Sequence, residues 1–289
     1  MKRTLLLLGG TGKMGTALRK VLSVDYTLIS KSSQDFDAGN QDQVKDLLNE
    51  VKPDIVINAV AMMGIDACER EPARAFLLNT LYPKWLAQHA DRLGYLLVHF
   101  STSSVFDGRK NGMYNEEDIP SPLNVYGVTK LGGDALIQAY AEQFYIFRIA
   151  MTFGLSLRGD QFTERMLEHA RTGKPLRVAD DVYDSPSYSM DIAREIQRIL
   201  EQERPFDLYH ICNRGRASLY ELVCHLTRAA GLDVPIERAS YKEFPHLGIK
   251  NTNTPLTTVR LNPLRSWQRA ADHFAESWSR EQASQLSAS

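Results

Sequence analysis

The feature that most constrains the fold is an apolar run near the N-terminus that leads directly into three glycines. Residues 4–8 form a short, continuous apolar segment, which is typical of a strand buried on both faces of a parallel sheet. Gly9, Gly12 and Gly15 follow at intervals of three, and residues 14–22 have the periodicity of an amphipathic helix. This order predicts a strand, a tight turn and a helix, which is how a parallel α/β sheet begins.

The glycine turn also predicts a binding site for the pyrophosphate of a dinucleotide. Glycine lets a phosphate approach the backbone, and the N-terminus of the following helix presents N–H groups and a dipole that favour anions. The spacing is G-x-x-G-x-x-G rather than the more usual G-x-G-x-x-G, and three glycines can also form an ordinary turn. Their position directly after the first strand favours the cofactor interpretation.

The loop after the expected second strand, at residues 26–30, indicates which dinucleotide binds. An acidic residue at this point would bind the adenosine ribose of NAD. Lys31, Ser32 and Ser33 stand there instead. A cation and hydroxyl groups, with no carboxylate to repel it, suit the 2′-phosphate of NADP, so NADP is the favoured cofactor and NAD the alternative. A loop of this composition could also be no more than solvated surface.

The rest of the chain predicts a doubly wound parallel α/β sheet with right-handed crossovers, and a smaller lobe after it. Residues 1–150 are expected to form a Rossmann-like dinucleotide-binding domain, and 151–289 mainly a substrate-binding lobe, partly interleaved with the first domain. Expected strands lie at 54–58, 95–100 and 145–149. Expected helices lie at 41–51, 71–93 with an interruption at Pro83, 161–171, 190–203 and 219–230, and the helix that carries Tyr126 and Lys130 is expected to continue to about residue 144; an irregular, polar tail follows.

Composition and charge exclude several other classes of protein. The net charge is −1 and the pI is near 6.7, and no basic tract stands out, so nucleic acid is not an expected partner. The apolar run at 5–8 ends at Gly9, too soon for a signal peptide or a membrane span. Cys68, Cys212 and Cys224 lack metal-ligand spacing. We expect a soluble, cytoplasmic protein with buried, reduced thiols, no metal site and no membrane partner.

Residues 101–130 carry the candidate catalytic groups. The apolar run at 95–100 is expected to deliver Thr102 to a strand end, where α/β sheets bind ligands. Tyr126 and Lys130 are four residues apart, so they lie on one face of a helix, and the ammonium group can lower the pKa of the phenol and make it a proton donor. A Tyr-x-x-x-Lys pair arises readily by chance, and the nucleotide site upstream is what favours a catalytic role.

Four motifs, in order along the chain, resemble those of the extended short-chain dehydrogenase/reductases. They are the glycine loop, Asn-Ala-Val-Ala at 58–61, Ser-Thr-Ser-Ser-Val-Phe-Asp-Gly at 101–108 and Tyr-Gly-Val-Thr-Lys at 126–130. Within that group the chain is most similar to the dTDP-4-dehydrorhamnose reductase family. The resemblance implies an NAD(P)-dependent oxidoreductase that reduces a nucleotide-linked 4-keto-6-deoxy sugar, as in dTDP-rhamnose and polysaccharide biosynthesis. Whether the chain forms a homodimer is left open.

The resemblance also assigns roles to individual residues. Thr102 takes the catalytic hydroxyl position, Tyr126 is the general acid, and Lys130 binds the nicotinamide ribose while lowering the tyrosine pKa. The implied cofactor contacts are Gly12, Lys13 and Met14 at the phosphates, Asp37 and Ala38 at the adenine, and Ala61 and Met62 beside the nicotinamide. Asn79 matches a helix asparagine of the family. From its apolar neighbours alone, it is either a satisfied core amide or a functional group.

The departures from the family pattern fall at the substrate end. The family commonly has Ser-Thr-Asp-Tyr where this chain has Ser103 and Ser104, so a carboxylate near the reaction centre is missing. A tryptophan expected shortly after Arg148 is replaced by Met151. The stretch at 181–193 matches a substrate-lobe motif usually written with Ser-Pro-Thr. These departures leave the identity of the sugar open.

Two other functions remain as alternatives. The chain loosely resembles the regulatory β subunit of methionine adenosyltransferase, so a catalytically silent, NADP-binding regulatory or scaffold protein is one hypothesis, motivated by Ser103. The intact pair of Tyr126 and Lys130 favours an enzyme. Epimerisation or dehydration is the other hypothesis, and the absence of an acidic residue beside Thr102 disfavours dehydration.

Overall fold

A six-stranded parallel sheet organises the larger lobe of the computed structural model, which describes residues 2–159 and 161–288. Its strand order is β10-β5-β4-β3-β1-β2, and every neighbouring pair is parallel. The strands are β1 (Thr4–Leu8), β2 (Thr27–Lys31), β3 (Ile55–Asn58), β4 (Leu96–Thr102), β5 (Phe144–Ile149) and β10 (Asp207–Ile211). The chain goes from β1 to β2 on one side and then to β3 on the other, so a crevice opens at the carboxyl ends of β1 and β3.

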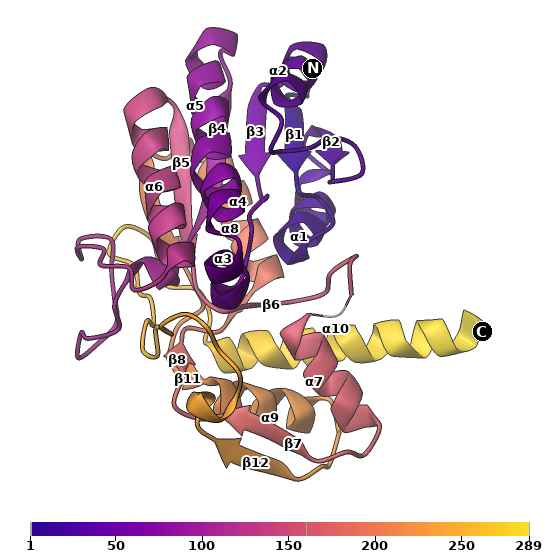
Figure 1. The fold of residues 1–289 in the computed structure, drawn as a ribbon. Coiled ribbons are helices and arrows are strands. Elements are labelled where there is room, and N and C mark those ends of the chain that lie inside the picture. Colours follow the sequence, from indigo (N-terminus) through magenta and orange to yellow (C-terminus); the bar gives the residue numbers. More distant parts are fainter. Residues whose placement is uncertain (1, 160, 289) are drawn as a thin grey trace.

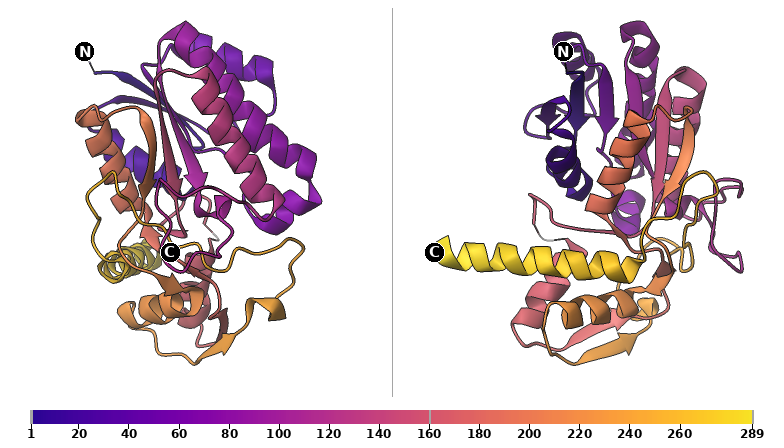
Figure 2. Two further views of the ribbon diagram at one scale, coloured as in Figure 1. Left: turned by 90° about the vertical axis from the view of Figure 1, so that its left-hand side faces the viewer. Right: turned by 180° about the vertical axis from the view of Figure 1, so that it is seen from behind.

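Helices cover both faces of this sheet, which confirms the doubly wound prediction (Figures 1 and 2). Leucines of β1 alternate between two buried clusters, one under α1 and α8 and the other under α2, α5 and α6. Burial on both faces explains why the strands are continuous apolar runs. The helices are α1 (Lys13–Leu22), α2 (Gln41–Val51), α5 (Tyr82–Leu93), α6 (Val125–Tyr140) and α8 (Ser189–Glu201).

The chain crosses between the two lobes several times. The smaller lobe lies below the carboxyl edge of the sheet in Figure 1, but α8 and β10, both after residue 150, belong to the sheet lobe. The sheet lobe therefore extends beyond residues 1–150. The smaller lobe contains β6 (Thr152–Phe153), α7 (Phe162–Arg171), β7 (Leu176–Ala179), β8 (Tyr183–Asp184), β9 (Ser187–Tyr188), β11 (Ala217–Ser218), α9 (Leu219–Ala229) and β12 (Ile236–Ala239).

The expectation of an irregular C-terminal tail is wrong, because residues Trp267–Ala288 form a helix, α10 (Figure 1, yellow). Its first three turns bury an apolar stripe against α9 and β9. The stripe comprises Trp267, Ala270, Ala271, Phe274, Ala275 and Trp278. Because three of these residues are alanines, the 3.6-residue period is less conspicuous in the sequence than a period of larger apolar residues.

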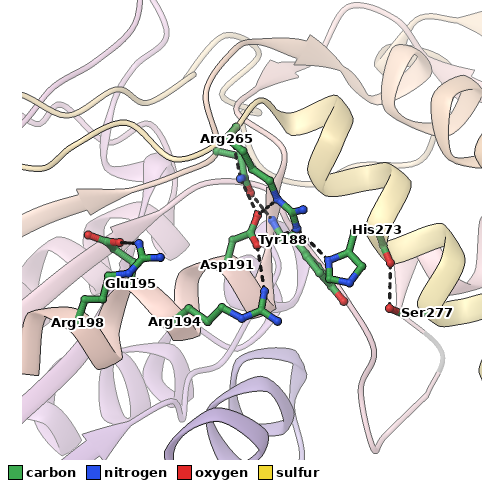
Figure 3. Close-up of polar contacts among 9 residues, drawn as sticks. Tyr188, Asp191, Arg194, Glu195, Arg198, Arg265, His273 and Ser277 are labelled. Atoms are coloured by element: carbon green, nitrogen blue, oxygen red, sulfur yellow. Dashed lines mark hydrogen bonds and ion pairs between the residues drawn. The ribbon is translucent and has the colours of Figure 1, made fainter. Parts of the chain in front are cut away.

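An ion pair fixes the start of α10 to the sheet lobe. Arg265 donates to both carboxylate oxygens of Asp191, at the start of α8, over 2.7 and 2.8 Å (Figure 3). Asn213, just after β10, donates to the same carboxylate over 2.9 Å. A bidentate arginine–carboxylate pair has a defined geometry, so it sets the direction in which the chain enters the last helix. None of the helices within residues 2–159 and 161–288 has both the length and the apolarity needed to cross a bilayer.

Candidate active site

The three glycines after β1 have different structural reasons to be glycine. Gly9 has φ of +87°, and a Cβ on Gly15 would lie 2.3 Å from Gly9 O, so both are required by the packing of the turn against α1. Gly12 has an ordinary φ of −73°, and the nearest atom to its added Cβ is Gly9 O at 3.8 Å. The protein itself leaves this space open. A phosphate that approaches the backbone would use the same space, so the loop fits a dinucleotide.

The first turn of α1 presents backbone rather than side chains to this space. Within the described residues, no side chain caps the helix. Met14 is buried in the core beneath the sheet, and Lys13 Nζ reaches across to Thr152 O over 2.7 Å. Burial lowers the pKa of Lys13, against the opposing effect of Glu164. Lys13 and Met14 can therefore serve a phosphate mainly through their backbone N–H groups.

The loop after β2 contains a carboxylate that the sequence analysis did not take into account. Ser32 donates to Asp35 Oδ2 from both its backbone N–H, over 2.7 Å, and its hydroxyl, over 2.9 Å. These hydrogen bonds lower the pKa of Asp35. The expectation of a loop free of carboxylates is therefore wrong. Ser32 is bound to a carboxylate, so Lys31 is the expected 2′-phosphate ligand that carries positive charge. Farther along, Asp37 accepts from Gly39 N–H over 2.8 Å.

Asn79 holds the segment expected beside the nicotinamide. It lies in a π-helical turn, Leu77–Leu81, between α4 (Pro72–Phe76) and α5, which Pro83 helps to start. Its side chain accepts from Met62 N–H over 2.9 Å and donates to Met62 O over 3.0 Å and to Thr129 over 3.1 Å. All of its polar atoms are thus satisfied, and they fix Ala61 and Met62 relative to α6. Asn79 is both a satisfied core amide and a positioning group.

The structure brings Thr102, Tyr126 and Lys130 together. Thr102 ends β4, and Tyr126 lies in the first turn of α6, which Asn124 caps by accepting from Gly127 N–H over 2.9 Å. The side chain of Thr102 lies close enough to the Tyr126 phenol to lower the pKa of that phenol, against the effect of burial. A hydroxyl pair at the carboxyl edge of a parallel sheet can hold a carbonyl oxygen and donate a proton to it.

The charges in this group differ from the sequence-based expectation. Lys130 Nζ contacts His99 Nε2 at 3.0 Å and Phe100 O. Burial raises the pKa of Tyr126 to about 12, although the Thr102 side chain opposes this, and burial lowers the pKa of Lys130 to about 8. The expectation of a lowered tyrosine pKa is therefore wrong for the ligand-free protein, because loss of solvation raises that pKa and Lys130 is not among the groups that oppose the rise.

A cavity of about 1050 Å³ lies between the lobes and reaches Tyr126. Tyr126 and Ser104 line one side, and segments 161–166, 177–179 and 241–250 of the smaller lobe line the other. Its lining includes several cationic or potentially cationic side chains, namely Arg70, Arg165, Arg177, His246 and Lys250. The lining also includes the carboxylate of Asp66, but the cationic groups outnumber it, so the cavity can take a ligand that is both sizeable and negatively charged.

The smaller lobe supplies a carboxyl group next to the end of β4. Asp184, in β8, accepts from Ser103 Oγ over 3.0 Å and from Met151 N–H over 3.1 Å. Burial raises its pKa to about 7. Both contacts involve the positions where the chain departs from the family pattern. Sequence reasoning missed Asp184 because it is 81 residues from Ser103, and only the fold brings the two together.

All three cysteines are free thiols; Cys68 and Cys212 are buried, whereas Cys224 is half-buried. Burial raises the pKa of Cys68 to about 11 and that of Cys212 to about 12, so neither is a reactive thiolate at neutral pH. Among the described residues, no group of three or more His, Cys, Asp or Glu side chains could hold a metal ion.

The fold and the site together define an oxidoreductase of the extended short-chain dehydrogenase/reductase class. The family model described as RmlD substrate binding domain matches residues 2–279, and the chain belongs to that family. It is 31% identical over 285 residues to the dTDP-4-dehydrorhamnose reductase of Aggregatibacter actinomycetemcomitans, covering 92% of this chain and 96% of the relative. It is also 31% identical over 240 residues to spore coat polysaccharide biosynthesis protein SpsK of Bacillus subtilis, covering 83% of each.

Solved structures agree with this assignment. A dTDP-4-dehydrorhamnose reductase from Clostridium acetobutylicum superposes with a TM-score of 0.89 and 28% identity, covering 94% of this chain and 98% of that one. The enzyme from Bacillus anthracis, in complex with NADP, superposes with a TM-score of 0.91 at 24% identity, covering 96% and 100%. The second likeness supports the fold.

The space at Gly12 gives a first prediction. Gly12→Val should keep the fold, because its φ and surroundings accept a side chain, but should weaken NADPH binding by about two orders of magnitude or more, roughly 3 kcal/mol. Calorimetric titration measures the affinity, and circular dichroism checks the fold. Gly15→Val is the contrasting variant and should destabilise the protein itself. Unchanged NADPH affinity in a folded Gly12→Val protein would show that the loop is only a turn.

A second prediction concerns Asp184. Its pKa of about 7 in the folded protein exceeds the value of about 4 in an unfolded chain. Between these values only the folded state holds the proton, so parent stability falls as pH rises from about 4 to about 7. Asp184→Asn cannot ionise, so its stability relative to the parent should increase over that interval, by at most about 1.4 kcal/mol per pH unit.

Urea unfolding at a series of pH values measures this difference. Asp46→Asn, at an exposed position of α2, is the matched control and should follow the pH dependence of the parent. A difference between Asp184→Asn and the parent that stays constant with pH would contradict the assignment of a raised pKa to Asp184.

Proposed function

We propose that the protein uses NADPH to reduce the ketone of a nucleotide-linked 4-keto-6-deoxy sugar, with Tyr126 as the general acid. The observation that carries the proposal is that Thr102, at the end of β4, and Tyr126, in the first turn of α6, are brought together at the carboxyl edge of the sheet, close enough for the Thr102 hydroxyl to affect the pKa of the phenol. Tyr126 lines the cavity between the lobes, on the same edge of the sheet as the glycine turn. A ketone in that cavity would meet the proton donor and the cofactor site together.

In this proposal the protein's own side chains transfer one proton to the substrate. NADPH, when bound, would supply the hydride. Thr102 would hold the carbonyl oxygen, and Tyr126 would protonate that oxygen as it gains negative charge. The raised pKa of Tyr126, about 12, keeps the phenol protonated at neutral pH. Lys130 would turn from His99 toward the cofactor ribose, where its positive charge favours proton release from Tyr126.

The charge of the cavity supports a nucleoside diphosphate sugar as the substrate class. A diphosphate carries negative charge that arginine side chains bind in a bidentate manner. Arg70, Arg165 and Arg177 line the cavity, and Lys250 joins them from the segment after β12. Relatives named as dTDP-4-dehydrorhamnose reductases support the same class.

NADP is the cofactor that we favour, with NAD as the alternative. Lys31 lies at the end of β2, where a 2′-phosphate would bind, and the fold is shared with a reductase solved in complex with NADP. Ser32, the residue after Lys31, is hydrogen bonded to the Asp35 carboxylate. The preference for NADP over NAD therefore rests on the positive charge of Lys31. A cytoplasmic location stays a prediction.

Asp184 changes the balance among the alternative functions. The scaffold hypothesis rested on the loss of a carboxylate at Ser103, but Asp184 places a carboxyl group on that serine. This removes the motive for the scaffold hypothesis. It also removes the objection to dehydration, which was that no acidic residue stands beside Thr102. The carboxyl group of Asp184 contacts Ser103, the residue that follows Thr102. Net consumption of NADPH distinguishes reduction from both dehydration and epimerisation.

The enzyme hypothesis predicts a specific loss in Tyr126→Phe. This change removes the acid and keeps the ring, so the rate of ketone reduction should fall by about 10²–10⁴-fold. NADPH affinity should barely change. Tyr140→Phe, at an exposed position at the end of the same helix, is the matched control and should keep the parent rate. A Tyr126→Phe protein that turns over at the parent rate would contradict the assignment of the general acid.

A further inference from the structure

Three buried polar side chains form a chain of hydrogen bonds beneath the catalytic residues. Asn58, His99 and Lys130 are exposed by only 1%, 0% and 2%. Asn58 Nδ2 lies 3.0 Å from His99 Nδ1, and His99 Nε2 lies 3.0 Å from Lys130 Nζ. The three residues come from β3, β4 and α6. The hydrogen bonds made by Asn58 at one end of this series and by Lys130 at the other fix which atoms carry protons.

At the first end, the amide orientation of Asn58 is set by the backbone. Val60 N–H donates to Asn58 Oδ1 over 3.0 Å, so the other amide atom, the Nδ2 donor, faces the imidazole. His99 Nδ1 must therefore accept. A neutral imidazole carries one N–H, which then lies on Nε2 and points at Lys130.

At the second end, Lys130 Nζ must accept that N–H. An ammonium group has three donors and no acceptor, whereas an uncharged amine has one lone pair. The amine satisfies His99 and still donates to Phe100 O. An ammonium could only donate to Nε2, so His99 would have to carry its proton on Nδ1. That N–H would then face the N–H of Asn58 Nδ2, and two donors cannot form a hydrogen bond. The contacts therefore match only the uncharged amine, and any other state loses a hydrogen bond in a buried site.

The charged groups around Lys130 act in both directions. Asp134, one turn along α6, favours the ammonium, and Arg148 from β5 compensates that carboxylate at 3.4 Å. Tyr126 on the same helix and His99 from β4 are neutral at pH 7, because burial raises the pKa of the first and lowers the pKa of the second. Asp134 is therefore the carboxylate that opposes the amine state.

We propose that Asn58 and His99 stabilise the uncharged amine of Lys130 in the ligand-free protein, so that this form predominates at mildly alkaline pH, and that Lys130 there takes up one proton from solvent when it leaves His99 for the bound cofactor. The first half stands on the ligand-free contacts alone, whereas the second rests on the proposed function. His99 is then a positioning residue, and cofactor binding is coupled to protonation. Affinity for NADPH falls as pH rises through the Lys130 pKa of the free protein, approaching tenfold per pH unit.

The first experiment reads the tautomer of His99 in the ligand-free protein. Nitrogen-15 NMR of labelled histidine distinguishes protonated from unprotonated ring nitrogens, and His99→Gln assigns the signals. We expect Nε2 to carry the proton and Nδ1 to be bare at a pH above the Lys130 midpoint, which lies at about 8. A proton on Nδ1, or on both nitrogens, would overturn the proposal, because Lys130 would then have to be a donor or would have lost its partner.

A matched variant, Asn58→Asp, tests the cause. Its carboxylate can only accept, so His99 should switch its proton to Nδ1, and Lys130 should then become an ammonium donor to Nε2. Carbon-13 NMR of the lysine ε-carbons should show the titration of Lys130 moving up by about one pH unit or more. An unchanged tautomer and an unchanged Lys130 titration in folded Asn58→Asp would contradict the proposal.

The second half has its own readout. Calorimetric titration of NADPH in buffers with different ionisation enthalpies, above the Lys130 midpoint, should show uptake of nearly one proton by the parent and much less by Asn58→Asp. NADPH binding without proton uptake by the parent would overturn the coupling. Failure of NADPH to bind at all would contradict the proposed function and, with it, the coupling. The two NMR measurements would still decide the ligand-free assignment.

Discussion

The close packing of α6 between the end of β4 and the π-helical turn is the constraint on which the site depends. A Cβ on Gly127 would lie 2.3 Å from Ser104 O, and a Cβ on Gly133 would lie 2.3 Å from Asn79 O. Glycine at these two positions lets the helix approach both neighbours. As a result, Tyr126 meets Thr102 at the strand end. One turn later, the side chain of Lys130 passes under the strand to His99.

Burial decides the protonation states in this arrangement. Tyr126 and Lys130 both lose solvent, so each is pushed toward its neutral form: the phenol keeps its proton and the lysine tends to lose one. The site is thus prepared with a proton donor already in place. The positive charge that helps the donor release its proton is supplied only when Lys130 is protonated, which connects the proposed chemistry to the contacts beneath it.

The first half of the fold could be predicted closely because its signals are local. The bounds of β1 and α2 agree with the expected ranges at 4–8 and 41–51, since a continuous apolar run and an amphipathic period are read within one segment. The last helix, α10, could not be predicted, because alanines supply much of its buried face and make its apolar period hard to see in the sequence. Asp184 could not either, since its partner is on the other lobe and no local pattern relates them. The preference of Lys130 for His99 depends on burial, which spacing along a helix does not reveal.

Hydride transfer to a sugar ketone is the central claim, and isotope transfer tests it most directly. The protein would be incubated with NADPH carrying deuterium at the transferable C4 position and with a nucleotide-linked 4-keto-6-deoxy sugar, and the product examined by proton NMR and mass spectrometry. The account predicts one deuterium at C4 of the sugar for each NADPH oxidised, and no such product from Tyr126→Phe on the same timescale. Conversion of the sugar without deuterium incorporation, or binding of both ligands without any NADPH oxidation, would contradict it.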